Sequence, residues 1–437
     1  MPEMAIEGYG GCDARDWDEE GYRKSILQER ELRCRTVFRT AFAPSQSPNP
    51  ETVVVASSDG AVASYSLASC ISATSQPLHV NKVVNQKTLP GPLLAEPLFI
   101  IKGHKGPAYD LKFYWHGEEC LLFSCGDDGH LRGWNWKELL NSDIHGDMQG
   151  NSLKPILELA NPQHEGPWGA LSPIPENNAI AIDEQEGSVF SAAGDACAYA
   201  WDVETGKQKV VFKGHADYLH CITARKSSHQ IITGSEDGTT RIWDCRSGIC
   251  TQVIRPEKNF KSKVSSWVSS VATDTSESWL ACGTSTGLSV WSLLSSECIF
   301  SINSRSPVQD LLFDDNQILA VGSEPVLTRF SINGAALSQI KCAPQSAFSV
   351  SLHPSGVCYS DRWLWRTGGR LITIREPSVH VLLRRLGYMT KGLASDGENP
   401  APDFSKNPLY GIFLWIFSCC TFFIHSAPDF SLKHGDL

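Results

Sequence analysis

Hydrophobic and polar residues alternate with a period of two in short runs along most of the chain, and small polar turns separate the runs. This period is typical of half-buried β-strands. The clearest unit lies between Gly214 and Arg246. Its three runs cover residues 219–223, 230–234 and 239–244. Asp237-Gly238 precedes the last run, and a tight turn is expected there because Gly accepts a positive φ and Asp bonds its own backbone.

Two further units carry the same four residue types in the same order: His, then Ser or Thr, then Asp, then Trp. The three sets are His104, Ser124, Asp128 and Trp134; His164, Ser191, Asp195 and Trp201; and His215, Thr233, Asp237 and Trp243. The unit resembles the WD40 repeat, in which four strands occupy roughly 40 to 45 residues between Gly-His and Trp-Asp. This resemblance implies that each set forms a buried hydrogen-bonded chain, because buried polar groups are tolerated only when paired. We interpret these residues as structural rather than catalytic.

Weaker units extend the repeat on both sides. Strands are predicted over residues 37–42, 52–57 and 61–67 in a first blade that lacks the His and the Trp. A fifth blade over residues 268–293 keeps Trp291 but has Thr286 at the Asp position, and a sixth over residues 308–332 has Phe330 at the Trp position. Residues 69–95 and 138–157 are predicted to be inserted surface loops, because they are too long for ordinary hairpin connections.

A seventh blade begins over residues 345–354 and then loses the alternating pattern. The predicted fold is therefore an all-β, seven-bladed WD40 β-propeller over residues 36–356, with the last blade incomplete or aberrant. Residues 1–35 form a separate N-terminal segment, in which Asp16–Arg33 predicts an amphipathic helix. Packing of this helix on the propeller and binding of a partner are both open.

Residues 357–437 depart from the repeat. One choice of codons for residues 357–382, translated one nucleotide later, spells VIAIGGYGGLVDVSSQFGSHLCMF, which has two alternating strands around a glycine-rich turn. We hypothesise that the chain leaves its ancestral reading frame near Gly356 and ends in an aberrant, disordered tail. A genuine isoform and a reading-frame artefact are the two alternatives. Within the tail, Leu409–Ile424 is apolar but shorter than the roughly 20 residues of a membrane span; a tail anchor is the weaker alternative to an accidental apolar run.

The charge balance bears on the kind of partner. With 38 Lys and Arg against 48 Asp and Glu, the net charge is -10, which argues against a surface that grips nucleic-acid phosphates. Any contact with RNA is expected to be indirect. We expect no membrane contact apart from the weak tail-anchor alternative.

The 15 cysteines indicate no disulfide framework or metal site. The N-terminus has no apolar signal-peptide core, so a reduced, intracellular protein is expected. Cys120/Cys125 and Cys245/Cys250 lack the spacing of zinc ligands. We expect the cysteines in predicted strands to be buried small hydrophobes: Cys125, Cys197, Cys221 and Cys282. No cofactor and no metal are predicted.

Residues 283–287 satisfy the GxSxG pattern of a hydrolase nucleophile elbow. That elbow needs a strand, a sharp turn and then a helix. Here the pattern lies between two predicted strands, which disfavours the esterase interpretation. We predict that the protein is not an enzyme.

Residues 13–356 resemble the plant form of the THO complex subunit 6 family, the WD40 component of the TREX machinery. The resemblance is carried by ILQERELRCRTVFRTAFAP, GHKGPAYDLKFY, SCGDDGHLRGWNW, NPQHEGPWGALSP, AAGDACAYAWDVETGK, FKGHADYLH, TGSEDGTTRIWDCR and QILAVGSEPVLTRF. It implies a nuclear scaffold that binds other THO/TREX subunits and supports messenger RNA processing and export. The tail after residue 356 departs from the family, which places closure of the last blade in doubt.

A second functional class comes from Trp243-Asp244-Cys245-Arg246, which is similar to the WDxR box of substrate receptors of cullin-4 RING ubiquitin ligases. In that family Asp244 and Arg246 would face the adaptor of the ligase. The motif has only four residues and recurs in WD repeats, so the other interpretation is a strand end with a solvated arginine. The scaffold and receptor roles need not exclude each other.

Overall fold

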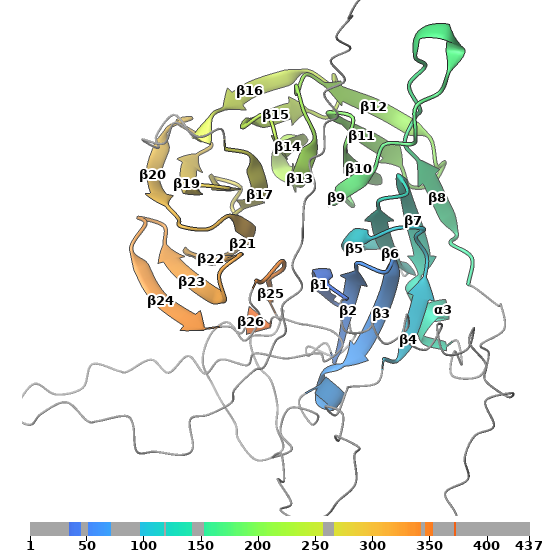
Figure 1. Ribbon diagram of the computed structural model, residues 1–437, viewed down its shortest axis with the longest axis horizontal. Coiled ribbons are helices and arrows are strands. Elements are labelled where there is room, and N and C mark those ends of the chain that lie inside the picture. Colours follow the sequence, from blue (N-terminus) through green and yellow to red (C-terminus); the bar gives the residue numbers. More distant parts are fainter. Residues whose placement is uncertain are drawn as a thin grey trace, which may run out of the picture.

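The computed structural model describes residues 35–44, 51–70, 97–117, 119–141, 153–256, 266–341, 346–352 and 371–372. These residues form six four-stranded antiparallel sheets, arranged as blades around a common axis, together with a two-stranded sheet (Figure 1). The structure is therefore an all-β propeller.

The blades follow one another in chain order. Blade one contains β1 (Val37–Phe42), β2 (Thr52–Ser57), β3 (Ala61–Ser66) and β4 (Phe99–Lys102). Blade two contains β5 (Ala108–His116), β6 (Glu119–Gly126), β7 (His130–Asn135) and β8 (Leu157–Ala160). Blade three contains β9 (Asn177–Asp183), β10 (Ser188–Ala193), β11 (Cys197–Asp202) and β12 (Gln208–Lys213).

The second half repeats this order. Blade four contains β13 (Leu219–Arg225), β14 (Gln230–Ser235), β15 (Thr240–Asp244) and β16 (Cys250–Ile254). Blade five contains β17 (Val268–Thr273), β18 (Trp279–Thr284), β19 (Gly287–Ser292) and β20 (Cys298–Asn303). Blade six contains β21 (Val308–Asp314), β22 (Gln317–Gly322), β23 (Val326–Ser331) and β24 (Ala336–Lys341). The predicted strands of blade one are confirmed to within one residue.

The turns between the second and third strands show why the sequence folds into these hairpins. Gly129 and Gly238 have φ values of +70° and +75°, a left-handed conformation that strains any residue with a Cβ. The Asp237 carboxylate accepts a hydrogen bond from the backbone N–H of Thr239 at 2.9 Å. The Asp-Gly turn predicted from the sequence is therefore formed by backbone and side chain together.

Apolar side chains from neighbouring blades meet face to face and form the core. Between blades three and four, Phe212 and Trp243 are buried with their rings 5.9 Å apart in an edge-on arrangement. Each blade is hydrophobic on both faces because it lies between two others. The strands therefore contain longer buried runs than strict alternation predicts, as in β10, where all six residues are buried.

The sector between blades six and one contains β25 (Ser351–Leu352) and β26 (Leu371–Ile372), which pair antiparallel (Figure 1). The prediction of a seven-bladed propeller with an incomplete last blade is confirmed only as far as six blades, because the described residues contain six complete four-stranded blades. The physical reason lies in the loss of alternation after residue 356, which leaves no strand-forming pattern for the remaining hairpin. β25 and the segment before it nevertheless contact blade one: the backbone N–H of Thr40 donates to Ser349 Oγ at 3.1 Å, and Ser351 Oγ donates to the Thr40 carbonyl at 2.8 Å.

An arginine near the axis links blades on both sides of this sector. Arg39 on β1 forms ion pairs of 2.8 Å with Asp110 on β5 and with Asp310 on β21. The two aspartates also accept hydrogen bonds from the backbone N–H groups of Ile180 at 2.8 Å and Val350 at 2.9 Å. Burial would lower the pKa of Arg39, but the two carboxylates outweigh it and raise that pKa above the ordinary value, so the guanidinium stays charged.

Several predictions from the sequence concern other parts of the chain. The helix α3 (Trp136–Asn141) overlaps the start of the predicted 138–157 loop, for which the repeat pattern indicates no helix. The predicted helix Asp16–Arg33, nearly all of the 69–95 loop and the apolar run Leu409–Ile424 lie outside the described residues. In the described part of the chain, no helix has the length and hydrophobicity needed to cross a membrane.

Replacing Arg39 by Met should destabilise the whole propeller, because Asp110 and Asp310 would remain buried without their counter-charge. We expect a loss of about 3–5 kcal/mol in the free energy of unfolding. The exposed Arg305, changed to Met in the same way, should stay within about 0.5 kcal/mol of the parent. Urea unfolding monitored by tryptophan fluorescence measures both, and equal stabilities would refute the assigned role of Arg39.

Candidate functional site

Blade four joins its four predicted polar residues in one chain of hydrogen bonds. The Trp243 Nε1–H donates to Thr233 Oγ1 at 2.8 Å, and this hydroxyl lies 2.8 Å from His215 Nε2. His215 Nδ1 lies 2.9 Å from Asp237 Oδ2. Because a carboxylate only accepts, Nδ1 carries the imidazole proton and Nε2 accepts from the threonine hydroxyl. The chain therefore ties the loop before β13 to β14, β15 and the turn between them.

The environment holds His215 neutral and Asp237 charged. Burial lowers the pKa of His215 from its ordinary 6.5, and this outweighs the opposite effect of Asp237. Burial would raise the pKa of Asp237, but the hydrogen bonds from His215 and Thr239 hold it well below its usual range. These shifts arise from a closed structural network, with both groups already paired.

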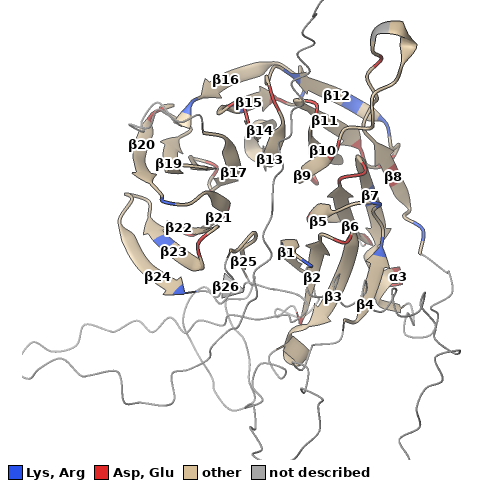
Figure 2. Ribbon diagram, in the orientation of Figure 1, with Lys and Arg blue, Asp and Glu red and all other residues tan. Residues whose placement is uncertain are grey.

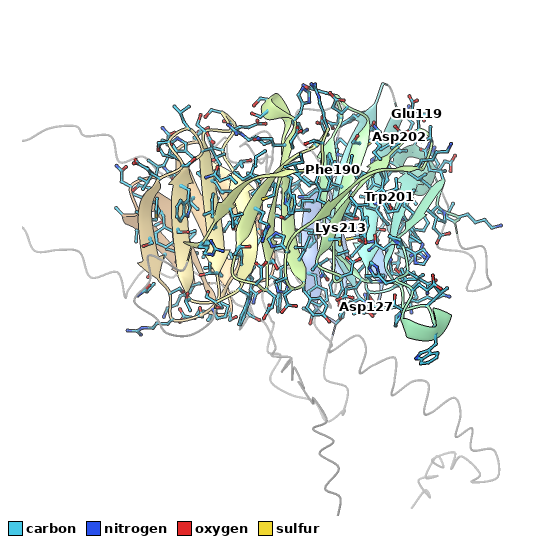
Figure 3. All side chains as sticks on the ribbon, turned by 90° about the horizontal axis from the view of Figure 1, so that it is seen from above. Glu119, Asp127, Phe190, Trp201, Asp202 and Lys213 are labelled. Carbon is cyan, nitrogen blue, oxygen red and sulfur yellow. The ribbon has the colours of Figure 1, made fainter. Side chains whose placement is uncertain are left out.

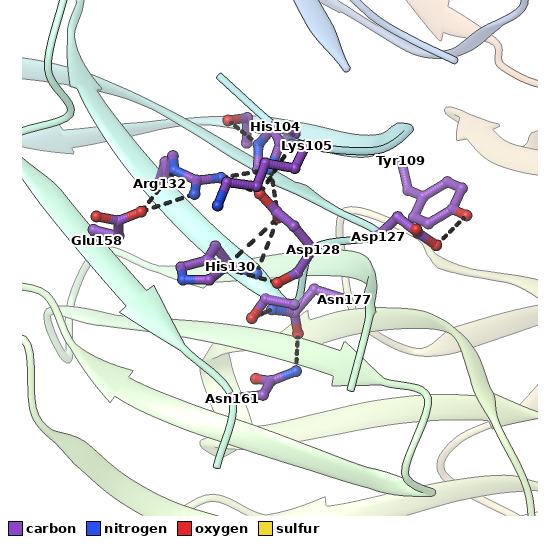
Figure 4. A network of polar contacts seen from close by, with 12 residues as sticks. His104, Lys105, Tyr109, Asp127, Asp128, His130, Arg132, Glu158, Asn161 and Asn177 are labelled. Atoms are coloured by element: carbon purple, nitrogen blue, oxygen red, sulfur yellow. Dashed lines mark hydrogen bonds and ion pairs between the residues drawn. The ribbon is translucent and has the colours of Figure 1, made fainter. Parts of the chain in front are cut away.

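Blade two contains the equivalent chain. The Trp134 Nε1–H donates to Ser124 Oγ at 3.1 Å, which lies 2.9 Å from His104 Nε2. His104 Nδ1 lies 2.9 Å from Asp128 Oδ1 (Figure 4). The His104 side chain is fully buried, so its ring is held by partners on both sides.

An arginine extends the blade-two chain to the outermost strand. Arg132 Nη1 donates to Asp128 Oδ2 at 2.7 Å, and Arg132 Nη2 lies 2.8 Å from Glu158 Oε1 on β8 (Figure 4). Burial would raise the pKa of Asp128, but hydrogen bonds from His104 and Arg132 lower it well below its usual range. Blade two is thus braced across three of its strands.

Blade three brings Ser191 to Trp201 but holds His164 apart from them. The Trp201 Nε1–H donates to Ser191 Oγ at 3.3 Å. His164 Nε2 lies 2.6 Å from Asp195 Oδ2, its side chain is half exposed, and no hydrogen bond joins the described residues His164 and Ser191. The Tyr199 hydroxyl donates to the same Asp195 carboxylate. The continuous chain expected from the sequence is therefore divided in this blade.

Loop length explains the difference. His104 and His215 each stand four residues before the first strand of their blade, β5 or β13, whereas His164 stands thirteen residues before β9. Two buried asparagines connect this longer loop to β9: Asn161 Nδ2 donates to Asn177 Oδ1 at 2.8 Å (Figure 4). The sequence signal of this change was the spacing: His164 and Ser191 are 27 positions apart, whereas the equivalent residues are 20 positions apart in blade two and 18 in blade four.

The same loop presents an aromatic side chain to solvent. Trp168 is fully exposed at 102% and adopts φ 79° within the short 3-10 helix η2 (Pro167–Gly169). The loop extends from the propeller between β8 and β9 (Figure 1, green). The repeat pattern of the sequence indicates no role for Trp168. Its signal was a tryptophan between Pro and Gly, in a stretch without alternation.

The propeller has two faces of different construction. The side view places Asp127 on one face, and Glu119 and Asp202 on the opposite face (Figure 3). The Asp127 face is formed by the turns between second and third strands and by the loops between blades. The Asp202 face is formed by the other turns of each blade, including the β15–β16 turn that contains Arg246.

The predicted adaptor contacts differ in availability. Asp244 Oδ2 accepts from the backbone N–H of Ser247 at 3.1 Å, and the Ser247 hydroxyl binds the same carboxylate. These bonds lower the pKa of Asp244. Arg246 is exposed, and its guanidinium has no hydrogen bond or ion pair with the described residues. Asp244 thus shapes the turn, while Arg246 is free to meet another molecule.

Other candidate chemistry has no support in the described ranges. They contain no group of three or more His, Cys, Asp or Glu side chains able to hold a metal ion. Cys125, Cys197, Cys221 and Cys282 are buried, as predicted, and burial raises the pKa of Cys282 to about 12. The GxSxG pattern lies between strands β18 and β19, where Ser285 Oγ donates to Ser266 Oγ at 3.0 Å.

The divided chain of blade three predicts unequal effects of histidine replacement. His215→Ala should cost about 3 kcal/mol in the free energy of unfolding, because Asp237 and Thr233 lose a buried partner. His164→Ala should cost less than about 1 kcal/mol, since the His164–Asp195 pair is half exposed. Denaturant unfolding of both variants tests this, and equal losses would contradict the division.

Mild acid should destabilise blade four through His215. The unfolded chain takes up the imidazole proton below about pH 6.5, whereas burial delays protonation in the folded chain. Between the two pKa values the unfolded state binds more protons, so the free energy of unfolding falls as the pH falls from 7 to 5. His215→Gln should remove this part of the dependence. Urea midpoints of the parent and of His215→Gln at pH 7 and pH 5 measure this effect. An equal change of midpoint with pH in both proteins would rule out the contribution of His215.

Comparison with known proteins gives a consistent result. The family model described as WD domain, G-beta repeat matches residues 95–135 and 206–244, which include most of blades two and four. THO complex subunit 6 of Arabidopsis thaliana is 55% identical over 346 residues, covering 79% of this chain and 92% of the relative. The subunit 6 of Homo sapiens is 28% identical over 317 residues, covering 72% and 82%. The Danio rerio homolog is 29% identical over 263 residues, covering 59% and 74%.

None of these matches indicates an enzyme family. The match to the Arabidopsis protein extends over most of both chains, far beyond the two matched repeats. The chain therefore belongs to the THO complex subunit 6 family and is a WD40 β-propeller.

Proposed function

We propose that this protein is a non-enzymatic scaffold subunit of a nuclear THO/TREX complex and supports messenger RNA processing and export. The observation that carries the proposal is 55% identity to THO complex subunit 6 of Arabidopsis thaliana across most of both chains. The fold is consistent with it, because the perturbed polar groups of blades two and four are paired inside hydrogen-bonded networks. What remains for function is the outer surface of the two faces.

The partners proposed are other THO/TREX subunits, with RNA contacted only indirectly. A net charge of -10 opposes attraction of nucleic-acid phosphates. In the same proposal the residues of the blade-two and blade-four tetrads act in folding alone. Substitutions in these two tetrads would affect the complex only by lowering the amount of folded subunit.

We further propose that the ring is organised as seven sectors. The segment before β25 lies where the first strand of a seventh blade belongs, and it contacts Thr40 of blade one. The apolar face of blade six also packs on it: Ala347 and Val350 are buried with Leu319 and Val321. Two blade faces therefore flank the sector that the sequence predicted as an incomplete blade.

A second candidate function, as substrate receptor of a cullin-4 ubiquitin ligase, is favoured by the exposure of Arg246. Its guanidinium is unpaired among the described residues and lies in the WDxR turn. The engagement of Asp244 by Ser247 leaves Arg246 as the principal contact in this proposal. The Asp202 face would then meet the ligase adaptor and the opposite face the THO subunits.

Affinity purification of the tagged chain from plant nuclear extract, with mass spectrometry of the copurifying proteins, tests both candidates. We expect stoichiometric recovery of other THO subunits by the parent and by Arg246→Ala, because that change removes no internal contact. Arg246→Ala should lose only the cullin-4 adaptor. Recovery of the adaptor without THO subunits would reject the scaffold proposal, and loss of THO subunits in the variant would reject the division of faces.

A further inference from the structure

We propose that the loop between β8 and β9 is the anchor of a docking surface for a Lys/Arg-rich segment of a protein partner. This surface, the Trp168 surface, consists of Trp168 at the loop tip and the acidic side chains of the Asp127 face on blades two to four. The inference rests on the proposed function in taking the partner from the other THO subunits. It goes further by naming the face and the chemistry of the segment bound.

The first observation is that nothing within the described fold explains Trp168. The side chain is 102% exposed, so it contributes no buried area to the propeller. Its φ of 79° is a conformation that bulky residues rarely adopt. A strained backbone that presents a large apolar side chain to water is a pattern found at binding sites. Tryptophan is also one of the residue types enriched at the energetic centres of protein interfaces, together with tyrosine and arginine.

The second observation is that the loop is held in shape by its own hydrogen bonds. The Gly166 N–H donates to the Ala170 carbonyl at 2.8 Å, and the Ser172 N–H donates to the His164 carbonyl at 2.8 Å. At the base, the His164–Asp195 contact of 2.6 Å fastens the loop to blade three. The loop is therefore pre-organised, which reduces the entropy lost when a partner binds. It also gives the displaced His164 a structural task.

The third observation is the charge of the surrounding surface. The loops and turns of this face over residues 127–129, 161–176, 194–196, 214–218 and 236–239 contain no lysine or arginine. The loop before β5 on the same face contributes one exposed basic side chain, Lys105. The five ranges contain carboxylates that no Lys or Arg pairs with among the described residues: Asp127, Glu165, Glu176 and Asp217. The charge view shows Asp and Glu recurring in this part of the ring, with lysines on the outer strand β12 (Figure 2). Tyr218, 47% exposed, adds a second aromatic ring to the same face.

This combination selects a basic segment. Arginine and lysine are attracted both by unpaired carboxylates and by the face of an indole ring, and the apolar stems of their side chains pack on aromatic surface. An acidic segment or nucleic acid would be repelled by the same carboxylates. The Asp202 face has exposed apolar side chains of its own, such as Ile249 and Leu294, but among the described residues Trp168 is the only fully exposed aromatic side chain.

Site-specific cross-linking identifies what binds the surface. The photoreactive residue p-benzoylphenylalanine replaces Trp168 in the full chain, which is irradiated with the recombinant remaining THO subunits and a 30-nucleotide RNA. We expect a cross-link to a Lys/Arg-rich segment of one subunit. A cross-link to a neutral or acidic segment, or to the RNA, would overturn the proposed chemistry, and absence of any cross-link would overturn the surface.

Binding measurements with matched variants test the energetic role. We expect Trp168→Ser to weaken the affinity for the recombinant THO subunits by at least about tenfold, as for an interface centre. Asp127→Lys with Glu176→Lys should weaken it further and remove its salt dependence, while Ile249→Ser on the opposite face should bind as the parent does. Equal thermal melting shows that all variants are folded.

The outcomes separate this inference from the proposed function. Normal binding by the parent and by Trp168→Ser would overturn the Trp168 surface and leave the scaffold role intact. A parent that binds no THO subunit would overturn both. Weakening by Ile249→Ser alone would assign docking to the Asp202 face and also overturn the inference.

Discussion

An ion pair between Arg39 of blade one and Asp310 of blade six connects the ring of blades across the sector where the repeat pattern fails. A second ion pair joins Arg39 to Asp110 of blade two. A propeller has no free sheet edge only when its first and last blades are bound to each other, and the described seventh sector supplies just two short strands. Arg39 reaches partners 71 and 271 residues away in the chain. Because closure entropy grows with the logarithm of loop length, the longer contact costs only about 1 kcal/mol more than the shorter one. Among the described residues no other cation pairs with these two buried carboxylates, so their charges depend on Arg39.

A related rule, that every buried polar or charged group must have a partner, accounts for the different residues that bind the turn between the second and third strands of each blade. Where the tetrad histidine is present at the right distance, as in blades two and four, it pairs with the aspartate of the turn. Blade one has no such histidine, and Arg35 binds its turn residue Asp59 at 2.7 Å. Blade five has Thr286 in place of the aspartate, and Ser266 Oγ lies 3.1 Å from that hydroxyl. The partner changes from blade to blade, but the turn stays satisfied.

The strands and the tetrads of blades two and four followed from the sequence because both depend on local spacing: a period of two, and fixed distances between polar residues within one repeat. The divided tetrad of blade three did not follow. Residue types there match the repeat, but loop length decides whether His164 can reach Ser191. The contacts of Arg39 could not be predicted from the sequence either, because a single arginine in a strand does not indicate partners that are 71 and 271 residues away. Helix α3 was missed because it is short and lies where the repeat predicts only a connection.

The division in blade three has a consequence for how the molecule can act. In blades two and four the tetrad histidine is hydrogen-bonded inside its blade through both ring nitrogens. In blade three the longer loop places His164 at the base of an exposed hairpin, where it binds Asp195. The blade keeps its Trp201–Ser191 contact and loses little, because the Phe190 and Phe212 core still packs it against blade four. Rigid blades then carry a rigid loop, so the position of Trp168 relative to the Asp127 face is set by the fold itself. A scaffold gains specificity in this way, since a partner must match both the indole and the carboxylates beside it.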